Sequence, residues 1–231
     1  MIIFNGTALE SIAPVKIEDI RVSPIVQTPV ARDRPVTAGM TFIRAHEGTR
    51  TVSINFAILE QDHDTRQNYI EAITAWALSE QPAPMLLPYR QGKMLYAICT
   101  ALPDPSTRQW WESRLNLTFT AYDPFFYDLE EKAANLGNAV FIRGNALPKM
   151  RIEATLAASG DLTFSDGRDT MTFTGVPAGA LVIDLIMQTA QVDGVSIMDK
   201  FAFTSTFIRP RLGPMTVTGT GTLKWREGWQ A

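Results

Sequence analysis

The sequence predicts a mainly β protein in two domains, an α+β domain over residues 1–137 and an all-β sandwich over residues 138–231. Apolar and polar residues alternate along short segments in both halves, which is typical of half-buried strands. One segment of the first half instead has apolar residues at helical spacing. The polar stretch Leu129–Asn138 lies between the two halves and is interpreted as a linker.

The first domain starts with an extended segment and a regular strand. Between Ser23 and Gly39 lie three prolines and the charged run Arg32–Arg34. This composition favours a long loop or an extended excursion over a compact core. The next segment, Thr51–Ile58, alternates cleanly and is predicted to be a strand. Its inward residues would be Val52, Ile54, Phe56 and Ile58.

A helix is expected to follow, from Asp64 to Ser79. Asp64 can cap the first turn, and Gln67, three residues on, can reach back in a capping-box arrangement. Pro82 and Pro84 come after its end. The apolar face at i, i+4, i+7 and i+8 consists of Tyr69, Ile73, Trp76 and Ala77.

The rest of the first domain is predicted to be strands. Leu86–Tyr89 and Met94–Thr100 flank a turn, and Leu115–Thr120 places its apolar residues on one face. Asp123-Pro124 ends this strand, because proline has no N–H for the ladder and restricts the residue before it. The aromatic cluster Phe125–Tyr127 follows directly.

The second domain has strand patterns throughout. Asp166-Gly167 lies between two alternating runs and predicts a tight hairpin, because both turn residues tolerate positive φ. From Met215 to Trp225, threonines line one face and apolar residues the other. Many short strands with frequent turns predict a β-sandwich. The other predicted strands are Met150–Leu156, Leu162–Phe164, Met171–Phe173, Ala180–Leu185 and Val192–Ile197, the last with a turn at Val192–Val195 inside it.

The composition argues against several classes of protein. The 231 residues are 45 % hydrophobic and carry a net charge of −3, so nothing global points to nucleic acid or an anionic membrane. No apolar run reaches the ~20 residues of a membrane span. Met1–Gly6 lacks the basic region of a signal peptide. Cys99 is the single cysteine, cannot form an internal disulfide, and is interpreted as a small core residue.

The residue types that usually carry chemistry are not grouped in a known pattern. His46 and His63 do not have the spacing of a zinc site. Asp161, Asp166 and Asp169 do not fit an EF-hand and are explained by a hairpin flanked by carboxylates. No glycine-rich loop opens a helix. We therefore expect no enzyme activity, and no catalytic, cofactor-binding or metal-binding residues.

A series of short motifs resembles the distal tail proteins of long-tailed phages. In the first half they are Phe4–Thr7 with Asn5 and Gly6, Gly48–Phe56, Ala75–Leu78 with Trp76, Leu95–Ala97, and Asp123-Pro124 with the aromatic run to Tyr127. In the second half, Gly144–Ile152 and Leu181–Asp184 resemble strands of a galectin-like domain. The resemblance implies a first domain related to tail-tube subunits, followed by a galectin-like sandwich.

The resemblance also implies a role in the virion. Such a protein forms a ring-shaped homo-hexamer, a hub that joins the tail tube to the tail tip, baseplate or fibre. It would be made in the cytoplasm of the bacterial host and located at the tail tip of a phage or prophage particle. No nucleic-acid-binding site is expected, although the lumen of the ring can pass DNA. Many relatives carry Arg-Asp-Gly where this chain has Arg32, Asp33, Arg34 and Pro35, the expected assembly loop.

Two alternatives remain open at the level of sequence. The second half could bind carbohydrate, with Trp225 and Trp229 stacking on sugar rings. Galectins, however, use a histidine in their sugar site, and residues 138–231 contain none. The chain could also be a tail-tube or other minor tail subunit, for which the appended sandwich would be unusual.

Overall fold

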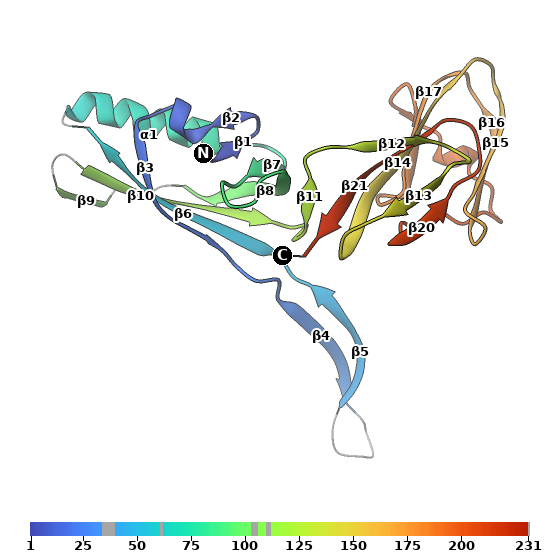
Figure 1. Cartoon of the computed structure of the whole chain (residues 1–231), viewed down its shortest axis with the longest axis horizontal. Coiled ribbons are helices and arrows are strands. Elements are labelled where there is room, and N and C mark those ends of the chain that lie inside the picture. The colour runs from blue at the N-terminus through green and yellow to red at the C-terminus, as the bar shows by residue number, and fades with distance from the viewer. Residues whose placement is uncertain (34–39, 61, 103–105, 110–111, 231) are drawn as a thin grey trace. The chain divides into compact units, whose positions relative to one another are not determined.

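The computed structural model describes residues 1–33, 40–60, 62–102, 106–109 and 112–230. The chain forms two compact units, Met1–Phe126 and Tyr127–Ala231 (Figure 1). The described residues contain one α-helix, and the rest of the regular structure is almost entirely β-strand. The predicted mainly β class is therefore confirmed.

Unit 1 combines antiparallel strands with a helix. Strand β10 lies between β6 and β8, and β3 pairs with the other side of β6. Strand β7 joins β8 to the short strand β1. The elements in chain order are β1 (Ile3–Phe4), β2 (Thr7–Ala8), η1 (Leu9–Ser11), β3 (Val15–Val22), β4 (Gln27–Asp33), β5 (Met40–Glu47), β6 (Arg50–Leu59), α1 (His63–Ala77), β7 (Ala83–Leu86), β8 (Lys93–Ala101), β9 (Ser106–Gln109) and β10 (Glu112–Ala121).

One face of the β6–β10 pair forms the core of unit 1. The inward residues that alternation predicted are 0 to 2 % exposed: Val52, Ile54, Phe56 and Ile58 on β6, and Leu115, Leu117 and Phe119 on β10. The opposite face is polar, and Asn116 donates to Ser53 Oγ at 2.9 Å across the pair. The strand ends at Ala121, just before Asp123-Pro124, as expected. The period of two in the sequence therefore gives both the strands and their buried face.

Helix α1 begins earlier than the sequence analysis predicted. Its N-cap is Asp62, whose carboxylate accepts from the Thr65 N–H at 2.7 Å, so Asp64 lies inside the first turn. Both aspartates can cap a helix. Asp62 is the cap because Thr65, three residues later, lies in the first turn, where the N–H groups have no partner within the helix. The predicted inner face is confirmed at Ile73 and Ala77, which are buried.

The strand before β8 also lies earlier than predicted. Leu86–Tyr89 was expected to be a strand, whereas β7 is Ala83–Leu86. Ala83 and Met85 are its buried residues. The chain then turns, with the Arg90 N–H donating to the Leu87 carbonyl at 3.0 Å. Local apolarity alone did not distinguish the strand from the turn that follows it.

Replacing Trp76 by alanine is expected to lower the free energy of unfolding of unit 1 by about 2–3 kcal/mol, at the low end for a large aromatic because the ring is only half-buried. The ring lies 5.7 Å from Phe4 and 6.2 Å from Phe119, and its Nε1 donates to the Thr7 carbonyl at 3.0 Å. Trp76→Phe keeps the ring contacts and should cost only about 1 kcal/mol. Hydrogen exchange of β6 and β10 measures the loss of stability in both variants. Equal losses for Trp76→Ala and Trp76→Phe would show that the ring contacts of Trp76 do not stabilise unit 1.

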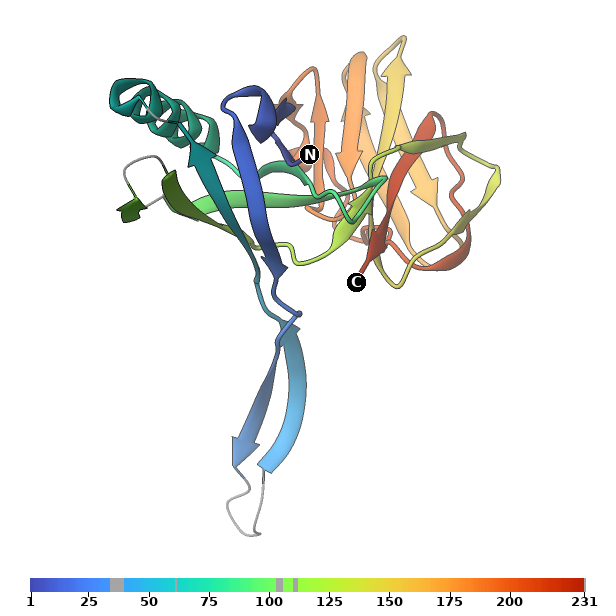
Figure 2. The ribbon, with the colours of Figure 1, turned by 60° about the vertical axis from the view of Figure 1, so that its left-hand side comes forward.

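Strands β4 and β5 form a separate hairpin that extends away from the rest of unit 1 (Figures 1 and 2). They pair only with each other among the described strands, from Gln27 opposite Glu47 to Asp33 opposite Met40. At the base, the Gly48 N–H donates to the Val26 carbonyl at 2.8 Å. The proline-rich segment is therefore half of a projecting two-stranded ribbon.

The regular structure in the described part of unit 2 consists of strands and one short 3-10 helix. One antiparallel sheet has the order β12, β21, β14, β17, β18, β19. The pairs β13–β20 and β15–β16 complete the unit. The elements are β11 (Phe126–Asp128, whose first residue ends unit 1), β12 (Lys132–Asn135), β13 (Ala139–Ile142), β14 (Ala146–Leu156), β15 (Gly160–Ser165), β16 (Thr170–Val176), β17 (Gly179–Asp184), β18 (Thr189–Val192), β19 (Val195–Ser196), η2 (Met198–Lys200), β20 (Gly213–Thr216) and β21 (Thr222–Trp229).

The core of unit 2 brings together the inward residues of this sheet and those of the two pairs. Ile152, Ile183 and Leu223 come from the sheet, and Phe164 and Phe173 come from β15–β16. The alternation of β14 and the pairing of the two runs around Asp166 are as predicted. Two β layers around one apolar core are consistent with the predicted sandwich.

The segment interpreted as a linker is part of unit 2. Lys132–Asn135 forms β12 and pairs with β21 along its length. Unit 2 accordingly begins at Tyr127, earlier than the boundary at Gly137 that the sequence predicted. β12 has no fully buried residue, although Ala134 packs against the core of unit 2. Polarity therefore misidentified it as a linker.

Two turns of unit 2 also differ from the prediction. The loop between β15 and β16 has four residues, and within it only Gly167 has positive φ, so Asp166-Gly167 is not a two-residue turn. The expected strand from Met215 to Trp225 is divided into β20 and β21. Gly221 lies at this break with φ +127, where an added Cβ would be 2.5 Å from the Glu153 carbonyl oxygen. Only glycine fits that approach.

Candidate assembly surfaces and structural motifs

The predicted assembly loop lies at the end of the β4–β5 hairpin. Arg32 and Asp33 are the last residues of β4 and pair with Thr41 and Met40. The side chains of both, and all of Arg34 and Pro35, lie outside the described residues. The structure therefore positions the backbone on one side of this loop, at the far end of a ribbon with two unpaired edges. Such edges can accept a strand or a loop of another chain.

The first group of motif residues holds the N-terminus against α1. Asn5 and Gly6 have φ values of +49° and +81° and connect β1 to β2, with Phe4 directly opposite Thr7. Two positive φ values are what a two-residue hairpin turn requires, and Asn-Gly supplies them. The carbonyl of Thr7 accepts from Trp76. The motif residues Asn5, Gly6 and Trp76 thus form one structural contact.

The second group of motif residues lies at the boundary between the units. The Asp123 carboxylate accepts from the Phe125 N–H at 3.5 Å, and Pro124 is buried. Tyr127 is 4 % exposed, with Lys149 Nζ 4.7 Å from its ring centroid. Sequence reasoning did not find Lys149, or the arginines that contact Phe126, because no local pattern marks a cation that packs on a distant ring.

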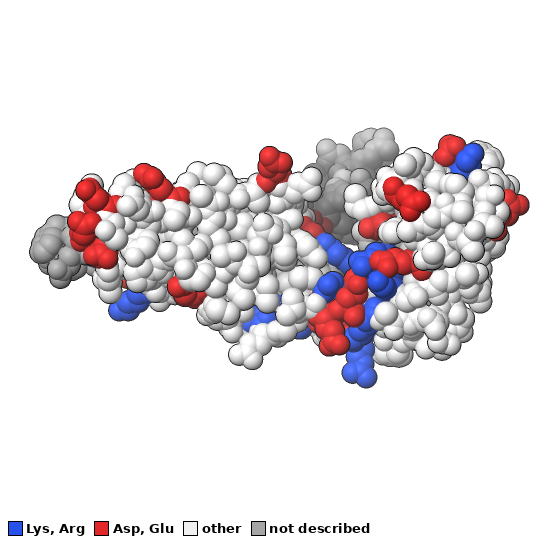
Figure 3. Space-filling model, turned by 90° about the horizontal axis from the view of Figure 1, so that it is seen from above, with Lys and Arg blue, Asp and Glu red and all other residues white. Residues whose placement is uncertain are grey.

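The open face of the unit 2 sheet carries a network of ion pairs. Arg151 binds Glu131 at 2.8 Å and Glu153 at 2.6 Å, and Lys224 binds Glu153 at 2.7 Å. Hydrogen bonds from Lys224 and Arg151 hold the pKa of the Glu153 carboxyl below its usual range. Near the middle of the surface that Figure 3 draws, basic and acidic side chains lie next to one another, whereas acidic ones predominate toward the left end.

A shallow hollow of about 340 Å³ adjoins this network, with Glu153, Thr155, Val182, Thr222 and Lys224 among its lining residues. The charges that border it already neutralise one another. A carboxylate that is held ionised by two cations is a poor general base, because its proton affinity is lowered. The face offers a balanced polar surface rather than a reactive site.

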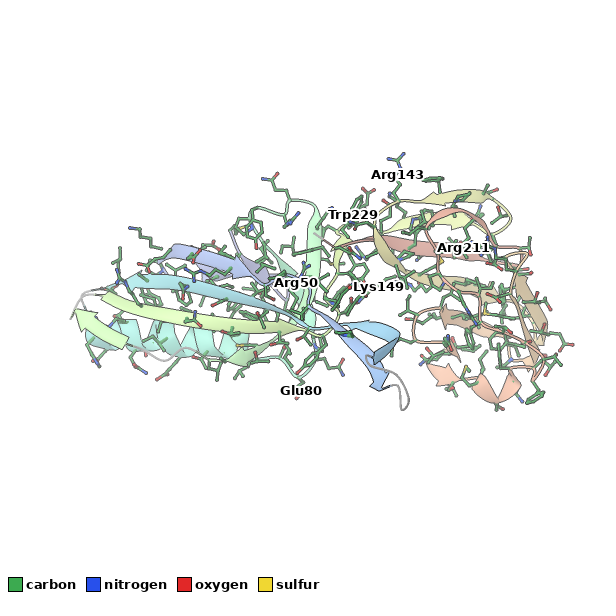
Figure 4. The ribbon with its side chains drawn as sticks, turned by 90° about the horizontal axis from the view of Figure 1, so that it is seen from below. Arg50, Glu80, Arg143, Lys149, Arg211 and Trp229 are labelled. Carbon is green, nitrogen blue, oxygen red and sulfur yellow. The ribbon has the colours of Figure 1, made fainter. Side chains whose placement is uncertain are left out.

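The two tryptophans of the carbohydrate alternative are both held by the structure of unit 2. Trp225 is 6 % exposed and belongs to the core. Trp229 ends β21, and its Nε1 donates to Asp128 Oδ1 at 2.8 Å (Figure 4). This hydrogen bond fixes the position of the Trp229 ring.

The remaining candidates for chemistry have structural roles where they are described. Asp161 accepts from the Gly175 N–H at 2.8 Å, and Asp166 contacts Arg211. Burial raises the pKa of the Cys99 thiol, which favours its protonated form. The described part of the chain holds no group of three His, Cys, Asp or Glu side chains that could bind a metal ion. No helix among the described residues is long and apolar enough to cross a membrane.

Comparison with solved structures identifies chains of the same fold. No protein-family model and no curated protein sequence matches this chain. The crystal structure of the SPP1 Dit protein (gp 19.1), described as a paradigm of the hub adsorption apparatus in phages that infect Gram-positive bacteria, is 14 % identical over 98 % of both chains, with a TM-score of 0.76. A chain of the phage P2 baseplate in its activated conformation with Ca is 7 % identical over 94 % of this chain and 91 % of that one, with a TM-score of 0.54.

Proposed function

We propose that this chain is a structural protein of the phage virion and forms a ring-shaped hub at the distal end of a long tail. The observation that carries the proposal is the fold shared with the SPP1 Dit protein over 98 % of both chains. The match extends through both units, which favours a distal tail protein over a tube subunit with one domain. The order of sequence motifs supports the same assignment independently of the coordinates.

The hub would work through geometry rather than chemistry. A closed ring needs a heterologous contact, in which one side of each subunit docks on the other side of the next. We assign this contact to unit 1, with six copies in the ring and the galectin-like unit 2 outside it. One face of the ring would bind the tail tube, and the other would bind the tail tip or fibre. No enzyme activity or cofactor is part of this proposal.

The full-length chain, purified at high concentration, is expected to form closed six-membered rings. Native mass spectrometry measures the number of subunits, and negative-stain images show whether the ring is closed. Six subunits without a central opening would argue against a hub through which DNA passes. A chain that stays monomeric at every concentration tested, alone and with its tail-tube protein, would contradict the proposal.

A further inference from the structure

The division between the two units falls within strand β11. Phe126 is the last residue of unit 1 and Tyr127 the first of unit 2. Both belong to β11, so their side chains point to opposite sides of the strand. They are 1 % and 4 % exposed. The two neighbouring aromatic side chains at this division are therefore both buried.

Two arginines of unit 1 contact the ring of Phe126. The guanidinium carbon of Arg50 lies 5.0 Å from the Phe126 ring centroid, and that of Arg90 lies 5.4 Å from it (Figure 4 labels Arg50). Arg50 is the first residue of β6 and pairs with Ala121, so its backbone is fixed by the sheet. Burial lowers the pKa of Arg50, and the charge of Arg90 lowers it further. A ring face attracts both cations, which otherwise repel each other.

Side chains of unit 2 contact the next two residues of β11, Tyr127 and Asp128. Lys149 Nζ lies 4.7 Å from the Tyr127 ring centroid. The carbonyl of Asp128 accepts from Arg226 at 3.0 Å, and its carboxylate accepts from Trp229 at 2.8 Å. Upstream, the ring of Pro124 fixes its own φ angle. The chain is thus restrained at nearly every residue from Pro124 to Asp128.

We propose that these cation–π contacts are a junction lock, in which Arg50 and Arg90 hold Phe126 while Lys149 holds Tyr127. The lock keeps β11 from opening locally at the two rings that these cations contact. It gives a physical role to the aromatic run after Asp123-Pro124. The inference does not depend on ring formation or on the hub proposal.

Limited digestion with chymotrypsin tests the lock, because Phe125–Tyr127 offers three aromatic cleavage sites in a row. A protease cuts such a segment only when it opens, so the rate of cutting reports the population of the open state. We expect the full-length wild-type chain to be cut slowly here. Cleavage within Phe125–Tyr127 is identified by the masses of the two fragments.

Removing either cation should accelerate this cleavage. Arg90→Gln and Lys149→Gln are each expected to raise the rate about tenfold, the equivalent of about 1.4 kcal/mol for one cation–π contact. Arg90→Lys keeps the charge and should lie between wild type and Arg90→Gln. Arg114→Gln is the matched control, because Arg114 is exposed and pairs with Glu18 on β3 instead.

The outcomes separate a lock from general destabilisation. Hydrogen exchange in β10 and β14 should be unchanged in the two test variants, which shows that both units stay folded. Wild-type cleavage as fast as that of the variants would overturn the lock. So would equal acceleration by Arg114→Gln, or an Arg90→Lys rate as high as that of Arg90→Gln.

Discussion

Removal of the β4–β5 hairpin is expected to abolish ring formation and to leave folded monomers. Within the described residues, β4 and β5 pair only with each other, and the hairpin extends away from the sheet of unit 1 (Figures 1 and 2). A two-stranded hairpin alone is at best marginally stable in water. A ribbon with two unpaired edges is therefore best explained by a neighbouring subunit that covers it, which the hub proposal supplies.

The base of the hairpin gives a clean position for the deletion. Val26 and Gly48 are joined by a backbone hydrogen bond of 2.8 Å, so residues 27–47 can be replaced by Asn-Gly without separating β3 from β6. Removing only Ser23–Gly39 would leave β5 without its partner strand. Native mass spectrometry is expected to show six subunits for the wild type and one for the deletion.

A second variant distinguishes the tip of the hairpin from its strands. Replacing only residues 34–39 by Asn-Gly removes Arg34 and Pro35 and keeps both strands. Monomers from this variant would assign the contact to the predicted assembly loop, and rings would assign it to the strand edges. Rings that persist after the full deletion would show that the subunits contact each other elsewhere. Hydrogen exchange in β6 and β10 checks that unit 1 remains folded.

Sequence alternation predicted the long strands that bury one face, and it misplaced or missed the short strands β7 and β12. β6, β10 and β14 each expose one face and bury the other, so apolar and polar residues alternate along their sequences. β12 alternates only between half-buried and exposed residues, and its pairing with β21 depends on residues far away in the chain. The length of the β15–β16 loop likewise follows from long-range packing. Asp166 contacts Arg211 there, which no turn rule includes.

The same limit applies to the motif residues. Asn5-Gly6 predicts its own turn, because positive φ at both residues is a local property. The aromatic run after Pro124 could be recognised as a motif but not explained from sequence. Its partners Arg50, Arg90 and Lys149 come from three different strands and turns. A cation and an aromatic ring that contact each other in the fold are not separated by any characteristic number of residues in the sequence.

Asp166→Ala is expected to cost unit 2 about 3–5 kcal/mol, because it breaks a buried ion pair and leaves its partners without an acceptor. The Asp166 side chain is 0 % exposed and contacts Arg211. Its Oδ1 also accepts from the N–H groups of Arg168 and Asp169, at 3.0 and 2.8 Å. The carboxylate thereby ties the β15–β16 loop to the chain before β20. Hydrogen exchange in β14, β16 and β21 measures the loss.

Asp166→Asn separates the charge from the shape of the side chain, and Asp199→Asn is the control at an exposed aspartate. Burial opposes ionisation of Asp166, but the backbone hydrogen bonds and Arg211 outweigh it and hold its pKa below the usual range. A lowered carboxyl pKa stabilises the folded state fully above the unfolded value of about 3.9, and this contribution is lost as the pH falls toward the folded value. The difference between wild type and Asp166→Asn should therefore be largest at neutral pH and shrink below about pH 4. A difference that stays constant across this range would mean that the amide disturbs packing and that the charge of Asp166 contributes nothing.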